Sequence, residues 1–146
     1  MGGLVTLRLP HALADEIRRH GEHAYPAECC GALIGRIDGE SKEVAGLAPA
    51  VNRRTDDPHR YLIAPEDLRQ LEVQARAAGH EIVGYYHSHP DHPARPSAFD
   101  AEHAWPWYSY LIVRIDQGRG ADMASWVLDD DSPQMHSEPL DVLSEV

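Results

Sequence analysis

The chain has 146 residues, a length typical of one domain that buries a hydrophobic core without disulfides. Apolar residues make up 42% of the chain and charged residues 25%, which indicates a folded globular protein rather than a disordered one. The formal net charge of −11 disfavours nucleic acid or an anionic membrane as a partner, because both require clustered Lys and Arg.

Cysteine usage and hydropathy together predict a reducing, cytoplasmic location. The two cysteines, Cys29 and Cys30, are adjacent in the sequence. Neighbouring strand residues point to opposite faces, so this pair forms neither a disulfide framework nor a chelate. The sequence starts without a basic-then-apolar leader, and no apolar run approaches the roughly 18 residues of a membrane span. We therefore expect a cytoplasmic protein with no membrane partner.

Helix and strand signals alternate along the first third of the chain. Apolar residues at near-helical spacing predict a helix from Pro10 to about His23, with the proline in its first turn. The segment "CCGALIG" (29–35) is typical of a buried strand, and a turn at Asp38–Glu40 leads into a second strand near Glu43–Val51. The polar residues 52–60 are expected to form a loop.

The alternation continues to the end of the chain. The expected elements are a short strand at Tyr61–Ile63, a helix that Pro65 opens and Gly79 closes, a strand at 81–89, a short helix from about Ser97 to Trp105, strands at 108–115 and 123–128 separated by a turn at Gly118 and Gly120, an exposed turn at the acidic residues 129–131, and one more strand or short helix in the tail. We therefore predict an α/β (α+β) fold in which helices flank a mixed β-sheet, within a single domain that spans residues 1–146.

The stretch "YYHSHPDHPARPSAFD" (85–100) combines histidines, aspartates and prolines at a predicted strand end. The strand period of two places His87 and His89 on one face and turns Ser88 away. A proline-rich loop can return Asp100, in the first turn of the next helix, to the strand end. Two neutral imidazoles and a carboxylate suit Zn²⁺ and leave a fourth position for water, which is the open arrangement of catalytic zinc sites.

A polar turn without a metal explains the same residues. Exposed His-x-His pairs are common, and the chain has 10 histidines. Ser97 followed three residues later by Asp100 is also typical of a helix N-cap with an acidic residue in the first turn. The spacing alone leaves both explanations open. Other hydrolase motifs, such as His-Glu-x-x-His or Gly-x-Ser-x-Gly, do not occur in the sequence.

The motif resembles the signature of the JAMM family (the metal-binding JAB or MPN domains), in which an upstream Glu precedes His-Ser/Thr-His-Pro-x6-Ser-x2-Asp. The residues that match, spacing included, are His87, Ser88, His89, Pro90, Ser97 and Asp100. "YPAECCGALIG" (25–35) is similar to the family's segment around its upstream glutamate, and "NRRTDDPHRYLIAPEDL" (52–68) is similar to the following loop and helix start. The resemblance implies a JAB/MPN-like (cytidine-deaminase-like) sandwich with a curved, mixed sheet.

The resemblance also implies a zinc isopeptidase or peptidase. His87, His89 and Asp100 would hold one Zn²⁺ and its bound water. Glu28 would take a proton from that water and deliver it to the leaving amine. Ser97 would donate a hydrogen bond to the oxyanion. From the residues alone Glu28 is an ordinary carboxylate at a strand start, so its role comes only from the family pattern.

Other conspicuous residues near the motif receive no role. Cys30 either lines the cleft or, as is more common for this residue type, fills the core. Asp91, His92 and His103 also lie near the motif. His92 is in the variable part of the motif and is expected to be exposed, and His103 lies on the next helix. Three aromatic residues either flank a substrate groove or belong to the core: Trp105, Trp107 and Tyr108.

Members of this family hydrolyse the amide after the C-terminal Gly-Gly tail of ubiquitin or a ubiquitin-like protein. The compact chain resembles the small prokaryotic members, so the implied partner is a ubiquitin-like or sulfur-carrier protein. One alternative is a RadC-like JAB-domain protein linked to DNA repair, whose motif typically has Asn where this chain has Ser88. The other is a non-catalytic MPN scaffold, but such domains usually lack a ligand position, and none is missing in this sequence.

Overall fold

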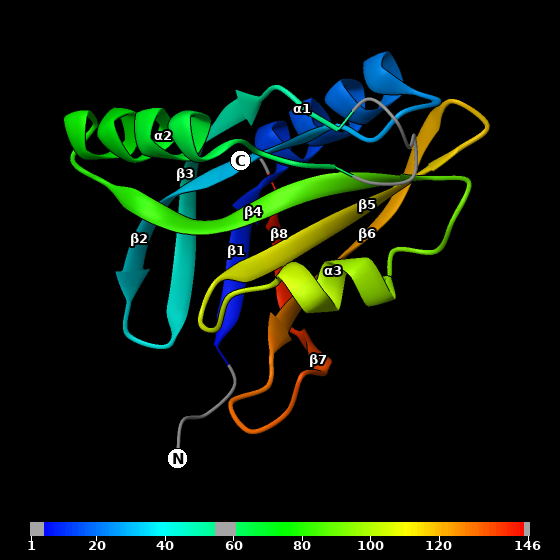
Figure 1. Cartoon of the computed structure of the whole chain (residues 1–146). Helices are drawn as coiled ribbons and strands as arrows, with labels where there is room; N and C mark the ends of the chain where they lie inside the picture. Colours follow the sequence, from blue (N-terminus) through cyan, green and yellow to red (C-terminus); the bar gives the residue numbers. More distant parts are fainter. Residues whose placement is uncertain (1–4, 55–60, 145–146) are drawn as a thin grey trace.

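The computed structural model describes residues 5–54 and 61–144, which form a mixed sheet and three helices (Figure 1). The strands are β1 (Thr6–Pro10), β2 (Cys30–Asp38), β3 (Ser41–Ala50), β4 (Glu81–Pro90), β5 (Ser109–Asp116), β6 (Arg119–Leu128), β7 (Met135–Glu138) and β8 (Leu140–Leu143). The helices are α1 (His11–Ala24), α2 (Pro65–Ala77) and α3 (Ala98–His103). The strand order is β7-β6-β5-β4-β2-β3-β1-β8. β1 runs parallel to β3 and β8, and β4 runs parallel to β5, so the sheet is mixed, as predicted.

The two faces of the sheet bury separate apolar clusters, because successive strand residues point in opposite directions. Leu33 of β2 packs in one cluster with Ile17 of α1. The preceding residue, Ala32, packs in the other cluster with Leu71 of α2. α1 and α2 therefore cover opposite faces of the sheet, and the predicted α/β sandwich is confirmed. No helix within the described ranges is both long and apolar enough to span a membrane.

The main helix and turn signals are confirmed. α1 begins directly after Pro10, and α2 has Pro65 as its first residue, where the fixed φ of proline suits a helix start. Just beyond the end of α2, Gly79 has a φ of 77°, which glycine adopts without steric cost. The β2–β3 hairpin turns at residues 39–40, inside the predicted turn. These local signals position both helices against the sheet.

Three element predictions need correction. Tyr61–Ile63 is not a strand: Leu62 accepts one backbone hydrogen bond from Arg53 (2.8 Å) but joins no ladder. The N-terminal strand β1 was not predicted, because its five residues end at the proline that signals α1. The tail forms two short strands, β7 and β8, which lie at opposite ends of the strand order. Of the predicted loop at 52–60, residues 55–60 lie outside the described residues.

A buried ion pair joins strands that are far apart in the strand order. Lys42 of β3 and Glu138 of β7 have side chains 2% and 1% exposed, with Nζ 3.7 Å from Oε2. The Lys42 ammonium also donates to Ser109 Oγ (2.9 Å) and to the backbone oxygen of Trp107, and Glu138 Oε1 accepts from Ser125 Oγ (2.7 Å). Burial lowers the pKa of Lys42, and the attraction of Glu138 opposes this shift. Since four strands separate β3 from β7, this contact requires the curved sheet that was predicted.

Candidate metal centre

The end of β4 places two histidines side by side on one face of the sheet. His87 and His89 are 0% and 5% exposed. Ser88, between them, accepts a hydrogen bond at Oγ from the backbone N–H of Cys29 (2.8 Å) and donates its own N–H to the Cys29 carbonyl (3.2 Å). The predicted alternation of the motif is confirmed, and Ser88 ties the histidine strand to the residue that follows Glu28.

The start of α3 brings a carboxylate to the two histidines. Ser97 Oγ accepts a hydrogen bond from Asp100 N (3.0 Å), and Asp100 Oδ2 accepts one from Ser97 N (2.9 Å), which together form a capping box. The same Oδ2 lies 3.2 Å from His87 Nε2 and 3.1 Å from His89 Nε2. The sequence left open whether these residues cap a helix or form a group with the two histidines. Both arrangements are present, and they share Asp100 Oδ2.

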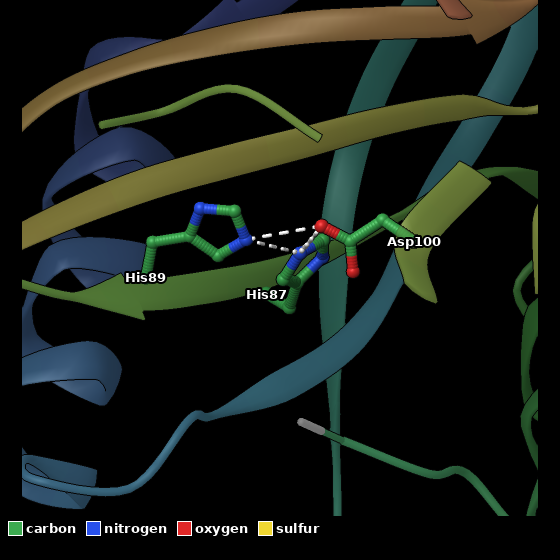
Figure 2. A group of neighbouring side chains, drawn as sticks. All are labelled: His87, His89 and Asp100. Carbon is green, nitrogen blue, oxygen red and sulfur yellow. Dashed lines mark hydrogen bonds and ion pairs between the residues drawn. The ribbon is translucent and has the colours of Figure 1, made fainter. Parts of the chain in front are cut away.

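The three polar atoms form a nearly equilateral triangle. His87 Nε2 and His89 Nε2 are 3.1 Å apart, close to their distances from Asp100 Oδ2. Figure 2 shows these side chains turned toward one another, the histidines from β4 and the aspartate from α3. In a tetrahedral zinc site with bonds of about 2.0–2.1 Å, neighbouring ligand atoms are about 3.3 Å apart. The spacing therefore fits a small divalent cation.

The hydrogen bonding of His89 supports the same fit. Its Nδ1 lies 2.8 Å from the backbone oxygen of Pro93, which can only accept, so Nδ1 carries the proton. In a neutral ring Nε2 then has only a lone pair, yet it faces a carboxylate oxygen of Asp100. Two acceptors at this distance repel each other unless a proton or a metal cation lies between them. The proline loop thus sets the tautomer that metal binding requires.

Electrostatics favour the protonation states of metal ligands. Burial lowers the pKa of His87 and favours the neutral ring, although the attraction of Asp100 opposes this shift. Burial raises the pKa of Asp100, but attraction to His87 and hydrogen bonds from the protonated forms of the two imidazole rings and from Ser97 N outweigh it. The pKa of Asp100 is consequently well below its ordinary value. A neutral imidazole and an ionised carboxylate are the forms that bind zinc.

Glu28 and Ser97 lie on the wall of one open cavity beside His89. Glu28 is 3% exposed and precedes β2, whose Cys30 is paired in register with His87. The Asn52 side chain donates to the Glu28 backbone oxygen (3.1 Å). The cavity has a volume of about 490 Å³ and is lined by Glu28, His89, His92, Pro93, Arg95, Pro96 and Ser97. All five predicted site residues therefore lie in one region of the molecule, although their roles remain predictions.

A smaller apolar cavity adjoins the other side of Asp100. It has a volume of about 200 Å³ and is lined by Tyr61, Leu62, Ile63, Leu68, Tyr85, Phe99, Asp100, His103, Trp105 and Tyr110. Trp105 is 68% exposed and Trp107 is 45% exposed, so the alternative that placed them in the core is wrong. Tyr108 is partly buried against the α2-side cluster. Trp105 instead flanks a groove beside the candidate metal centre.

Two residues near the site had no role in the sequence interpretation. The Tyr61 ring stacks on His87, with centroids 4.5 Å apart and an interplanar angle of 25°. Asp91 accepts hydrogen bonds from Tyr25 Oη (2.6 Å) and Gln117 N (2.7 Å), which fix the start of the loop. Neither contact has a local sequence signal, because each partner is distant in the chain. Cys30 is fully buried in the α2-side cluster, which confirms the core alternative for that residue.

The family of the chain follows from its match to a family model over residues 10–129, described as prokaryotic homologs of the JAB domain. The chain belongs to this family. The matched segment contains both candidate cavities and every predicted site residue. The resemblance drawn from the histidine motif is thereby confirmed at the level of the family.

Among the similar proteins, two with names that describe an activity are compared with this chain. The chain is 39% identical over 92 residues to the desampylase of Haloferax volcanii, which covers 62% of this chain and 65% of the relative. It is 32% identical over 114 residues to the probable TtuB-protein conjugate cleaving protease of Thermus thermophilus, which covers 78% and 73% of the two chains. The aligned segment thus spans just under two thirds of the desampylase.

Solved structures share the fold. A protein of Desulfitobacterium hafniense, solved in solution, superposes with a TM-score of 0.83 at 30% identity, covering 96% of this chain and 94% of the other. A JAB1/MPN domain protein of Archaeoglobus fulgidus superposes with a TM-score of 0.61 at 17% identity, covering 94% and 99%. The second likeness concerns the fold alone, and it confirms the predicted JAB/MPN-like sandwich.

Proposed function

We propose that the protein is a zinc-dependent isopeptidase or peptidase that hydrolyses the amide bond after the C-terminal Gly-Gly tail of a ubiquitin-like or sulfur-carrier protein. The observation that carries the proposal is the convergence of His87, His89 and Asp100 on one point. Glu28 and Ser97 line the cavity that opens beside this point. This arrangement combines an open metal site with a base and a hydrogen-bond donor, as amide hydrolysis requires.

The three ligand residues would hold one Zn²⁺, which would lower the pKa of a water ligand to about 7 and polarise a carbonyl. Glu28 would accept a proton from the attacking water and return it to the leaving amine. Its burial at 3% exposure keeps the carboxylate near the reaction and away from bulk solvent. The loop carbonyl of Pro93 would hold His89 in its ligand tautomer.

Ser97 would bind the oxyanion while it caps α3. Its Oγ accepts from Asp100 N, and among the described residues the hydroxyl proton has no acceptor. A hydroxyl has one donor and two acceptor positions, so capping leaves the donor available. A donor placed at the developing oxyanion contributes about 10²–10³ in rate in other amide hydrolases.

The substrate part of the proposal is supported by the names of the relatives and by the shape of the site. A desampylase and a probable TtuB-protein conjugate cleaving protease are both similar to this chain. Residues without side chains can approach a buried metal centre closely, which suits a Gly-Gly tail. The apolar cavity lined by Trp105 and Phe99 would then receive an apolar side chain of the carrier. We place this reaction in the cytoplasm.

The alternative functions are weaker. A role on DNA is disfavoured by the net charge of −11, since phosphate binding depends on clustered basic residues. A scaffold without activity does not require three ligand atoms 3.1–3.2 Å apart or a buried glutamate beside them. The experiments below separate a scaffold from an enzyme.

Metal content tests the ligand set. We expect about one zinc per chain by elemental analysis of the purified protein, and less than a tenth of this in His87→Ala and Asp100→Ala. His23→Ala, on the exposed side of α1, is the matched control and should keep its zinc. Undiminished zinc in both ligand variants would overturn the proposed site.

Cleavage of a fusion protein tests the reaction. A ubiquitin-like carrier whose Gly-Gly tail is joined to a reporter peptide should be cut after the second glycine by the wild type. Glu28→Gln removes the proton acceptor with little change in volume, so it should bind zinc normally and lose at least about 10²-fold in kcat. Equal cleavage by this variant would remove Glu28 from the mechanism, and no cleavage by the zinc-loaded wild type would favour the scaffold.

A further inference from the structure

The two candidate histidine ligands are held in place by different kinds of contact. His89 is oriented by a hydrogen bond from Nδ1 to the Pro93 carbonyl (2.8 Å). His87 Nδ1 is buried and has no hydrogen-bond partner among the described residues. Metal-binding histidines usually donate their second ring nitrogen to an acceptor that fixes the ring orientation. The orientation of His87 must therefore come from something else.

The flat face of Tyr61 fills this role. Its ring lies nearly parallel to that of His87, at an angle of 25° with centroids 4.5 Å apart, which is an offset-stacked geometry. His89 contacts the same imidazole only at a tilt of 59° and a distance of 5.0 Å. A stacked ring restricts rotation of the imidazole out of its plane, which would otherwise move Nε2 away from the other two ligand atoms.

The backbone that follows Tyr61 is itself fixed. The next residue, Leu62, donates its N–H to Asn52 Oδ1 (3.0 Å) and accepts from Arg53 N (2.8 Å). The Tyr61 ring packs against the α2-side cluster on its partly buried side. The ring is therefore held by its own chain segment and does not depend on His87 for its position.

We propose that Tyr61 is a positioning residue for the metal site, and that its stacked ring replaces the missing hydrogen bond of His87. This inference rests on the proposed metal centre. Loss of partners that orient metal ligands typically weakens metal binding by about 10- to 100-fold. The aromatic ring carries the effect, so the hydroxyl is dispensable for zinc affinity.

Zinc affinity in the absence of substrate tests the proposal, because Tyr61 also lines the apolar cavity and activity alone would not separate the two roles. Apparent Kd values are measured by competition with a chromophoric chelator for the wild type and three variants. We expect Tyr61→Phe to stay within about twofold of the wild type and Tyr61→Leu to bind at least about tenfold more weakly. Leu62→Ala is the matched control, since Leu62 is 46% exposed and lines the same cavity, and its Kd should not change.

The visible absorption of bound Co²⁺ provides a second measurement that reports ligand geometry. It should be alike in wild type and Tyr61→Phe, and shifted in Tyr61→Leu, while circular dichroism verifies that each variant is folded. A Tyr61→Leu variant with wild-type affinity and spectrum would overturn the proposal, as would a Tyr61→Phe variant as weak as Tyr61→Leu. Absence of zinc binding by the wild type would instead overturn the metal centre itself.

Discussion

In the proposed mechanism Ser97 has two functions, helix capping and oxyanion binding, and substitutions can separate them. As an N-cap it accepts one hydrogen bond from Asp100 N (3.0 Å), and its replacement by Ala in such a position costs about 1 kcal/mol, but by Gly only a few tenths. If the whole cap energy acted on the placement of Asp100, zinc affinity would fall about fivefold in Ser97→Ala and less than about twofold in Ser97→Gly. As the proposed oxyanion donor, the hydroxyl would contribute about 2.7–4 kcal/mol to transition-state binding.

The decisive measurement is kcat of Ser97→Gly at saturating zinc on a Gly-Gly-tailed fusion. Because glycine at this position costs the helix only a few tenths of a kcal/mol while the hydroxyl donor is lost, we expect a decrease of about 10²–10³ in kcat with zinc affinity close to that of the wild type. Ser97→Thr keeps both the cap and the hydroxyl and serves as the control. A Ser97→Gly enzyme with a kcat within a few-fold of the wild type would restrict Ser97 to capping and refute its role at the oxyanion.

Three further predictions concern the buried ion pair, the thiols and the groove. Lys42→Met should lower the free energy of unfolding in urea by about 3–5 kcal/mol, because it leaves the Glu138 charge buried without a partner. The double variant Lys42→Met with Glu138→Leu should recover most of this loss, and a double variant that loses the sum of both single changes would contradict the reasoning. Burial raises the pKa of Cys29 to about 11 and that of Cys30 to about 12, which lowers the thiolate population at pH 8 at least about a hundredfold. Iodoacetamide should therefore label both thiols only after denaturation, and rapid labelling of the native protein would contradict this. Trp105→Ala should raise KM for the carrier several-fold with a smaller change in kcat, and an unchanged KM would exclude Trp105 from the groove.

The strand period and the helix-start chemistry explain why part of the site was predictable. Alternation alone puts His87 and His89 on one face, and the Ser97–Asp100 spacing marks the start of α3. Both signals are local, involving residues at most three positions apart. The return of Asp100 to the strand end follows from the short loop between them. The fold class was predictable for a similar reason, since alternating strand and helix signals are local patterns.

Long-range pairing explains what the residues alone did not reveal. Glu28 resembles any other glutamate at a strand start until Cys29 and Ser88, 59 positions apart, join through two hydrogen bonds. The stacking of Tyr61 on His87 likewise depends on how a loop returns to the sheet. Strand β1 was missed because it consists of five residues and is recognisable mainly through its parallel pairing with β3 and β8. In each case the feature is defined by contacts with a strand that is distant in the sequence.

The burial of Lys42 has a consequence for the relation between this protein and its proposed substrates. Lys42 is the only lysine in the sequence, and its ammonium is enclosed by Glu138, Ser109 and the backbone of Trp107. Ubiquitin-like tails joined through isopeptide bonds require an accessible lysine amine as the acceptor. In its folded state the chain offers no such side chain, so the proposed isopeptidase would not itself be an acceptor for such tails through lysine.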